Sequence, residues 1–190
     1  DMQFHLNGFR PGSPDVQVRS PRTRPSTEVD VLIVGCGPAG LTVAAQLAAF
    51  PEIDTRIVER KAGPLEVGQA DGIAVRTVEM FNAFGFAERA LREAYWVNET
   101  VFWRPDPEDA RQIVRVRRIE DVEEGLSEFP HLILNQARVH DFYLDVMRNG
   151  PAQIEPDYER DVLGLTIDHT ARYPVEVKLE HEGRIETVRA

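Results

Sequence analysis

Three things that are scarce in this sequence narrow its class. It has one cysteine, Cys36, which excludes an internal disulfide and fits a reducing compartment such as the cytoplasm. The chain has 22 lysines and arginines against 32 aspartates and glutamates, which gives a net charge of −10. This charge argues against nucleic-acid binding, which depends on basic contacts to phosphates. No apolar run approaches the length of a membrane-spanning helix, and the N-terminus does not resemble a signal peptide. We therefore expect a cytoplasmic protein that binds neither nucleic acid nor a membrane, and we expect no metal site.

What the sequence does contain is a glycine-rich turn between a predicted strand and a predicted helix. Val31–Val34 are four apolar residues, three of them β-branched, and predict a central parallel strand covered on both faces. The three glycines that follow have the spacing that permits a tight turn, close approach to a pyrophosphate, and close packing of helix on strand. The N-terminus of the helix favours an anion. This pattern predicts a dinucleotide phosphate site made by Gly35, Gly37, Pro38, Ala39 and Gly40.

An acidic residue at the end of the next strand gives this turn its specificity. Leu41–Phe50 predicts a helix, and Thr55–Val58 predicts the second strand. Glu59 follows that strand at about the distance expected for a carboxylate that accepts a hydrogen bond from a ribose 2′-hydroxyl. Because such a carboxylate repels a 2′-phosphate, we expect FAD or NAD here rather than NADP. Arg60 and Lys61 come next and could either reach cofactor phosphates or face solvent.

The remaining chain predicts further helices and several strands. Residues 1–28, with four prolines and four arginines, predict an arm on the surface rather than a domain. We expect helices from Arg76, at Phe86–Ala94 and at Ala137–Arg148, and strands at Trp96–Trp103, Ile113–Arg118, His131–Gln136, Asp161–Ile167, Val175–His181 and Arg184–Val188, with a hairpin turn at Glu182–Gly183.

A further stretch carries a family resemblance. Gly68–Ile73 reads Gly-Gln-Ala-Asp-Gly-Ile and resembles the single-component FAD-dependent aromatic hydroxylases, in the phenol 2-monooxygenase and 3-hydroxybenzoate 4-monooxygenase branch. The glycine turn, the Glu-Arg-Lys end of the second strand and Asn135–Arg138 fit the same family. Met2–Phe9 and Arg89–Trp96 are most similar to the 3-hydroxybenzoate branch. The resemblance covers nearly the whole chain, and its Gln-Ala-Asp-Gly stretch is far more specific than the turn, which many flavoproteins share.

The resemblance implies a reaction as well as a cofactor. In this family FAD stays bound, NADPH reduces it, and dioxygen adds to give a C4a-hydroperoxide that transfers oxygen to a phenolic ring. The implied partners are a small phenolic substrate, 3-hydroxybenzoate or a related phenol, and a second copy in a homodimer. The alternatives are an FAD-dependent oxidase or dehydrogenase without hydroxylation, and a non-catalytic nucleotide-binding redox module. The Gln-Ala-Asp-Gly stretch favours hydroxylation, because a binding module needs no carboxylate beside the flavin ring.

By resemblance, Asp71 is the catalytic general base and contacts the substrate hydroxyl, and His131 contacts the substrate. An aspartate with a pKa of about 3.9 that takes a proton from a phenol of about 10 faces roughly 8 kcal/mol. Burial must therefore raise the pKa of Asp71, a tyrosine must relay the proton, or oxygen transfer must draw it off. Without the family, Asp71-Gly72 reads as a turn and His131 as a strand-end histidine. The residues expected to bind FAD are the five of the turn with Glu59, Arg60, Lys61, Gly68, Gln69, Ala70, Gly72, Ile73, Gln136 and Arg138.

These elements predict an α/β fold with a Rossmann-like FAD-binding domain. We assign residues 29–94 and 135–190 to that domain, which we expect to be incomplete. Residues 95–134 form interleaved antiparallel strands that contribute to a substrate-binding domain. A Rossmann-type sheet needs more parallel strands than the sequence provides, so we expect this chain to be the N-terminal fragment of a larger enzyme.

Overall fold

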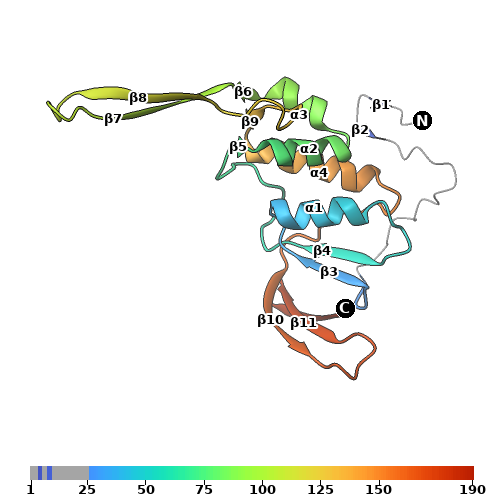
Figure 1. The fold of residues 1–190 in the computed structure, drawn as a ribbon. Helices are drawn as coiled ribbons and strands as arrows, with labels where there is room; N and C mark the ends of the chain where they lie inside the picture. The colour runs from blue at the N-terminus through green and yellow to red at the C-terminus, as the bar shows by residue number, and fades with distance from the viewer. Residues whose placement is uncertain (1–3, 6–7, 10–25) are drawn as a thin grey trace. The chain divides into compact units, whose positions relative to one another are not determined.

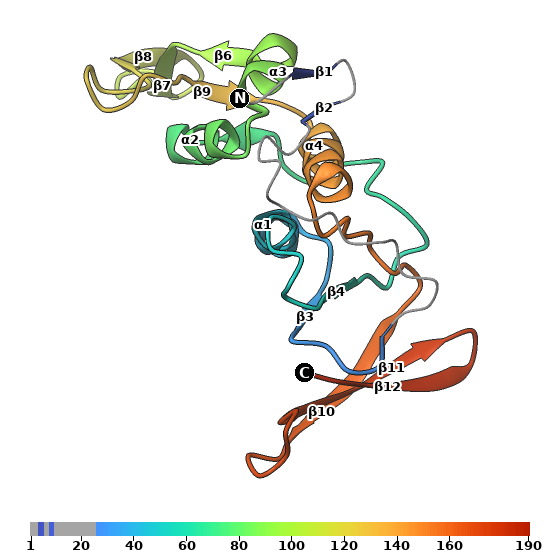
Figure 2. The same cartoon turned by 90° about the vertical axis from the view of Figure 1, so that its right-hand side faces the viewer.

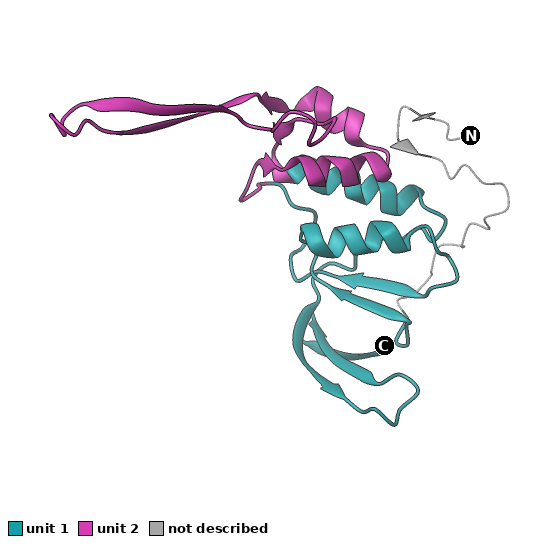
Figure 3. Cartoon of the chain, viewed as in Figure 1, with its two compact units in different colours: residues 1–66, 137–190 teal, residues 67–136 magenta. Residues whose placement is uncertain are grey.

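The computed structural model describes residues 4–5, 8–9 and 26–190, in two compact units (Figure 3). The first unit takes in residues 1–66 and 137–190, and the second residues 67–136. Most of the predicted arm lies outside the described residues. Of it, the structure describes residues 26–28 and a short antiparallel pair, β1 (Phe4–His5) and β2 (Gly8–Phe9). The predicted domain boundaries differ from the limits of these units, and the domain assignment stays a prediction.

The predicted strand–helix–strand motif forms the centre of the first unit. β3 (Val31–Val34) and β4 (Thr55–Val58) pair in parallel, and α1 (Pro38–Leu47) connects them and lies against both (Figures 1 and 2). The helix begins three residues before the predicted start, because proline fits the first helical position, where no N–H is needed. It also ends earlier than predicted, at Leu47.

The expectation that β3 is a central strand is wrong for the residues that the structure describes. Within them β3 pairs with β4 alone, and the side chain of Val34 is 57% exposed. Both faces of β3 are nevertheless contacted, as predicted: α1 lies against the strand, and Leu32 packs against a buried cluster that includes Val58 and Leu179. Four consecutive apolar residues predict burial of both faces, but they do not supply a strand at the second edge.

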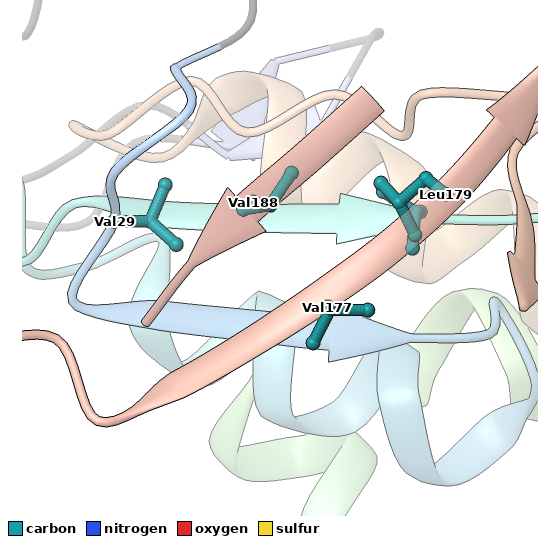
Figure 4. Packing of buried hydrophobic residues seen from close by; sticks show 5 residues of the cluster. Val29, Val177, Leu179 and Val188 are labelled. Atoms are coloured by element: carbon teal, nitrogen blue, oxygen red, sulfur yellow. The ribbon is translucent and has the colours of Figure 1, made fainter. Parts of the chain in front are cut away.

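A second, antiparallel sheet completes the core of the first unit. It consists of β10 (Asp161–Ile167), β11 (Val175–His181) and β12 (Arg184–Arg189), in that order. The first two strands have their predicted bounds, and the third is one residue longer. Val177, Leu179 and Val188 from this sheet pack with Val29 and Val58 (Figure 4). The antiparallel sheet therefore fixes β4, which carries Glu59 at its end, to the rest of the unit.

The last long helix returns to the first unit. α4 (Gln136–Asn149) begins one residue before its prediction and ends one residue after it. Its residue Tyr143 accepts a hydrogen bond of 3.0 Å from the Thr42 hydroxyl of α1. Gly150, just after α4, lies so close to the end of α1 that an added Cβ would be 2.8 Å from Ala48. The two helices are therefore packed tightly at both points.

The second unit contains a small sheet and two short helices. β5 (Gly72–Ile73), β9 (His131–Ile133) and β6 (Tyr95–Val97) form an antiparallel sheet with β9 in the middle. α2 (Val75–Ala83) and α3 (Ala87–Glu93) lie close to their predicted places. Gly85 separates them with a φ of +79°, a conformation that favours glycine.

A long antiparallel hairpin extends from this sheet. It consists of β7 (Glu99–Pro105) and β8 (Ile113–Glu120), which run side by side (Figure 1). Most residues of both strands are exposed. The prediction of one continuous strand from Trp96 to Trp103 is wrong, because the chain changes partners at Asn98. Before that residue it pairs with β9, and after it with β8.

Candidate functional site

The glycine turn has the backbone geometry that its spacing predicts. Gly35 has a φ of +94°, which favours glycine, and its N–H donates to the carbonyl of Val58 at 2.8 Å. A Cβ on Gly40 would lie 2.1 Å from the Gly35 carbonyl oxygen, so only glycine allows α1 to start this close to the turn. A Cβ on Gly37 would meet nothing within 4 Å. Gly37 thus faces open space at the N-terminus of α1, where a phosphate would sit.

The side chain of Glu59 is fixed against this turn. Its Oε2 accepts the backbone N–H of Cys36 at 2.8 Å, and its Oε1 accepts that of Lys61 at 3.0 Å. Burial raises the pKa of Glu59, but these two hydrogen bonds and the charges of Lys61 and Arg60 outweigh it and lower the pKa overall. The carboxylate is therefore ionised at neutral pH, and each oxygen keeps a lone pair for a ribose hydroxyl.

A hollow of about 550 Å³ lies beside the end of β4. Arg60 and Lys61 form part of its wall, so both cations lie within reach of a ligand there. Acidic residues from the antiparallel sheet and the segment before it form most of the opposite wall. The lining residues are Arg60, Lys61, Ala62, Glu159, Asp161, Glu180, His181 and Glu182.

Two buried groups behind the turn bear on its chemistry. Burial, with the nearby charge of Glu59, raises the pKa of the Cys36 thiol to about 12, so the thiol stays protonated. A buried, protonated thiol is a poor nucleophile, so Cys36 serves as a small residue of the turn. His140 of α4 is 5% exposed, and its Nε2 has no hydrogen-bond partner among the residues that the structure describes. Burial lowers the pKa of His140, opposed by Asp141 and Glu59, so its ring is neutral.

In the second unit the structure brings the Gly-Gln-Ala-Asp-Gly stretch against Gln136. The N–H of Gln69 donates to Oε1 of Gln136 at 2.9 Å. A Cβ on Gly68 would lie 2.6 Å from the Cβ of Gln136, so glycine is needed for this approach. With its carbonyl oxygen engaged, Gln136 keeps its amide N–H groups for another acceptor.

The same stretch places Asp71 and Gly72 beside β9. The carbonyl of Asp71 accepts the N–H of Leu134 at 2.8 Å, while its side chain is exposed. Gly72 pairs with Ile133, Ile73 pairs with Leu132, and Nε2 of His131 lies 3.5 Å from where a Cβ of Gly72 would be. The exposed residues Ala70 and Asp71 and the ring of His131 therefore lie around one short sheet.

His131 has a partner that sequence reasoning missed. Its Nδ1 lies 2.7 Å from Oδ2 of Asp121, and Oδ1 of Asp121 accepts the Thr100 hydroxyl at 2.7 Å. The hydrogen bond from Thr100 lowers the pKa of Asp121, burial partly offsets this, and the bond from His131 lowers it further. Asp121 is not among the site residues predicted from the sequence. The available signal was its position directly after a strand.

The candidate residues thus fall into two groups, one in each unit. In the first unit the turn meets Glu59, with Arg60 and Lys61 beside it. Arg138, also in this unit, donates to Asp141 at 2.8 Å and lies over the Phe142 ring at 4.8 Å. The second unit brings together the residues of the Gly-Gln-Ala-Asp-Gly-Ile stretch, His131 and Gln136.

Two features are absent from the part of the chain that the structure describes. No helix there combines the length and apolar character needed to cross a bilayer. Those residues also contain no group of three or more histidine, cysteine, aspartate or glutamate side chains arranged to hold a metal ion.

Comparisons with known proteins agree on one group. The FAD_binding_3 family model, described as an FAD binding domain, matches residues 28–190. The whole chain is 62% identical to a 3-hydroxybenzoate 4-monooxygenase of Comamonas testosteroni and covers 31% of it. Over 84% of its length it is 43% identical to an FAD-dependent monooxygenase of Aspergillus terreus, of which it covers 26%. The chain thus spans between a quarter and a third of the length of these relatives.

Solved structures show the same fold. The chain matches p-nitrophenol 4-monooxygenase from Pseudomonas putida with a TM-score of 0.72 at 18% identity, over 87% of this chain and 40% of that one. It matches the flavin-dependent monooxygenase PieE, solved with FAD and substrate, with a TM-score of 0.69 at 24% identity, over 88% of this chain and 30% of that one. These likenesses confirm the predicted Rossmann-like α/β fold.

Proposed function

Because this chain belongs to the family of FAD binding domains, we propose that it forms part of an FAD-dependent aromatic hydroxylase. The resemblance to that enzyme group is confirmed by the relatives. The observation that carries the finer proposal is the 62% identity to a 3-hydroxybenzoate 4-monooxygenase over the whole chain. We propose 3-hydroxybenzoate or a related phenol as substrate, NADPH as reductant and dioxygen as co-substrate. We also propose that the whole protein is a homodimer and lies in the cytoplasm.

The described residues fit the adenosine and pyrophosphate end of FAD. Gly37 leaves open space at the start of α1, and no acidic residue in the first turn of that helix would repel a phosphate. Glu59 is ionised and held in place, as an acceptor for ribose hydroxyls must be. Arg60 and Lys61 can neutralise phosphate charge from the adjoining hollow. When bound, FAD would supply the redox chemistry of the reaction, the transfer of electrons from NADPH to dioxygen.

Residues of the second unit would act on the substrate and the flavin ring. We propose that Asp71 accepts the proton of the phenol as general base, since the phenolate is the more electron-rich ring. Its side chain is exposed in this chain, so the burial that would raise its pKa has to come from bound substrate, bound flavin or other parts of the protein. The amide N–H groups of Gln136 would donate to the flavin, and His131 would contact the substrate.

A test uses the full-length protein that carries this chain. We expect purified protein to be yellow with bound FAD, and 3-hydroxybenzoate to accelerate NADPH oxidation and to appear as a hydroxylated product. Glu59→Gln removes the charge of the proposed ribose acceptor, and Glu52→Gln is the matched control at a remote acidic residue. Only Glu59→Gln should lower FAD occupancy. Colourless protein under all conditions would exclude a flavoenzyme. If the protein is yellow but no phenol accelerates its NADPH oxidation, the result would favour an oxidase or dehydrogenase.

A further inference from the structure

We infer that Asp121, held in turn by Thr100, is a positioning residue for the proposed reaction, because it fixes the ring of His131. This inference rests on the proposed function, in which His131 contacts the phenolic substrate. It adds two residues to the substrate site that neither the sequence nor the family relationship identified. Asp121 acts through His131 and does not itself contact substrate.

The geometry forms a chain of three side chains. The Thr100 hydroxyl donates to Oδ1 of Asp121 at 2.7 Å, and Oδ2 of Asp121 lies 2.7 Å from Nδ1 of His131. Each carboxylate oxygen therefore has its own partner, so the carboxylate cannot rotate without losing one of them. The side chain of Asp121 is 16% exposed and that of His131 is 30% exposed. The carboxylate is thus sheltered, while the histidine stays open to a ligand.

The fold explains why Asp121 lies at this point. It directly follows β8, and its backbone N–H donates to the carbonyl of Asn98 at 3.0 Å. Thr100 lies on β7, opposite Ile119 of β8. The base of the β7–β8 hairpin therefore brings both side chains to the start of β9, whose first residue is His131. The change of partners at Asn98, which the sequence did not predict, creates this junction.

The contact has a chemical consequence for the other ring nitrogen. An ionised carboxylate accepts and cannot donate, so Nδ1 of His131 carries the hydrogen. In the neutral ring Nε2 is then the acceptor, and in the protonated ring it is a donor aimed from a fixed position. Nε2 lies beside Gly72, the residue after Asp71. The neighbouring strand β6 places Val97 opposite His131 and has no charged residue, so Asp121 is the acidic group that sets the tautomer.

The experiment compares variants of the full-length, FAD-loaded protein by two readouts. Nitrogen NMR of the His131 ring reports its tautomer, and the KM for 3-hydroxybenzoate reports substrate binding. We expect Asp121→Ala to lose the preference for the Nδ1–H form and to raise KM about tenfold. Thr100→Val, which removes only the hydroxyl, should give a smaller change in the same direction. Asp121→Asn keeps an acceptor oxygen, so it should keep the Nδ1–H form of His131 and a KM close to that of the wild type. Glu120→Ala, the exposed neighbour on β8, is the matched control and should change neither.

A double-mutant cycle shows whether Asp121 acts through His131. In a His131→Gln background, Asp121→Ala should raise KM no further. An unchanged tautomer in Asp121→Ala, an unchanged KM, or an equal additional effect in the His131→Gln background would each overturn the inference. Wild-type protein that no phenol activates would instead contradict the proposed function. The two failures are distinguishable, because the tautomer is measured without turnover.

Discussion

At the scale of single residues, the predictions that hold depend on local backbone geometry. Gly35 and Gly40 could be assigned from spacing, because the tight turn between strand and helix needs a positive φ at Gly35 and leaves no room for a Cβ at Gly40. Asp121 could not be assigned, because its partner His131 lies ten positions away on another strand. The same holds for the contact between Gln69 and Gln136, 67 positions apart: the family resemblance implied that both residues bind FAD but did not predict that they touch each other.

Two glycines of the turn should fail in different ways. Gly40→Ala forces a Cβ to 2.1 Å from a carbonyl oxygen, so we expect a loss of about 1–3 kcal/mol in unfolding free energy together with weaker FAD binding. Gly37→Ala meets no protein atom within 4 Å and should leave stability almost unchanged, yet place a methyl group where a phosphate would sit. Urea unfolding and flavin titration of both variants measure this. Equal stability of the two would show that the close contact at Gly40 carries no strain.

Asp71→Asn tests the proposed general base. The variant should bind FAD normally and hydroxylate 3-hydroxybenzoate about 100-fold more slowly near pH 7, because general-base catalysis typically contributes at least that factor. The defect should shrink as pH rises toward the phenol pKa, since solvent then supplies the phenolate. Asp109→Asn, in the loop between β7 and β8, is the control for loss of one acidic charge. A constant defect across the pH range would contradict the base role of Asp71.

His140 should make stability depend on pH. Burial lowers its pKa below the ordinary value of 6.5, opposed by Asp141 and Glu59 and assisted by Lys61, so the unfolded chain binds the proton more readily than the folded one. The stabilisation is therefore present above about pH 6.5 and is lost as pH falls toward the lowered pKa. The slope for one proton is at most about 1.4 kcal/mol per pH unit. Denaturant unfolding at several pH values should show a shallower slope for His140→Gln, and equal slopes would contradict this assignment.

At the scale of elements, strands joined by short turns were predicted most accurately. β10 and β11 have their predicted bounds, because alternation and flanking turn residues are local signals. Where pairing is long-range, the boundaries failed. β6 and β7 read as one aromatic, β-branched strand, yet they pair with different partners. Strand propensity indicates that a segment is extended and does not identify its neighbour.

The turn between β11 and β12 allows a gain of stability. Glu182 and Gly183 have φ values of +50° and +75°, as in a type I′ turn, and glutamate is an unfavourable residue at the first position. We expect Glu182→Asn to raise unfolding free energy by about 0.5 kcal/mol and Gly183→Ala to lower it by about 1 kcal/mol. Thermal unfolding of both variants measures the difference. A destabilised Glu182→Asn would mean that Glu182 makes a contact that offsets its backbone cost.

At the scale of the whole molecule, the sequence predicted the fold class correctly and left the packing between distant segments open. The chain leaves the first unit after Glu66 and returns at Ala137, one residue into α4. The return point could not be read from the sequence, because α4 starts in one unit and continues in the other with a single helical pattern. Contacts between residues 1–66 and 137–190 therefore had to come from the structure.

Arg56 is the residue that joins those segments most directly. It is 4% exposed in the middle of β4, and its guanidinium donates to Asp157 at 2.6 Å, to Glu186 of β12 at 2.7 and 3.1 Å, and to the Ser26 carbonyl at 3.0 Å. Burial alone would lower the pKa of Arg56, but the hydrogen bonds and charges of Glu186 and Asp157 raise it overall. From sequence alone an arginine in a short strand is expected at the surface, so nothing in the sequence indicated this buried network.

Removing one side of the network should unfold the first unit rather than loosen one contact. Arg56→Ala removes the buried cation that Asp157 and Glu186 share and leaves Glu186 only the longer ion pair with Arg160 at 3.7 Å, so we expect a loss of about 3–5 kcal/mol in unfolding free energy. Arg56→Met with Glu186→Gln removes charge from both sides and should cost less than Arg56→Ala alone, because unpaired buried charge is the larger penalty. Arg76→Ala, which breaks an exposed ion pair with Glu79 at 2.8 Å, should cost under about 1 kcal/mol. A similar small cost for Arg56→Ala would show that water solvates the two carboxylates and that the antiparallel sheet is held on β4 by its apolar cluster alone.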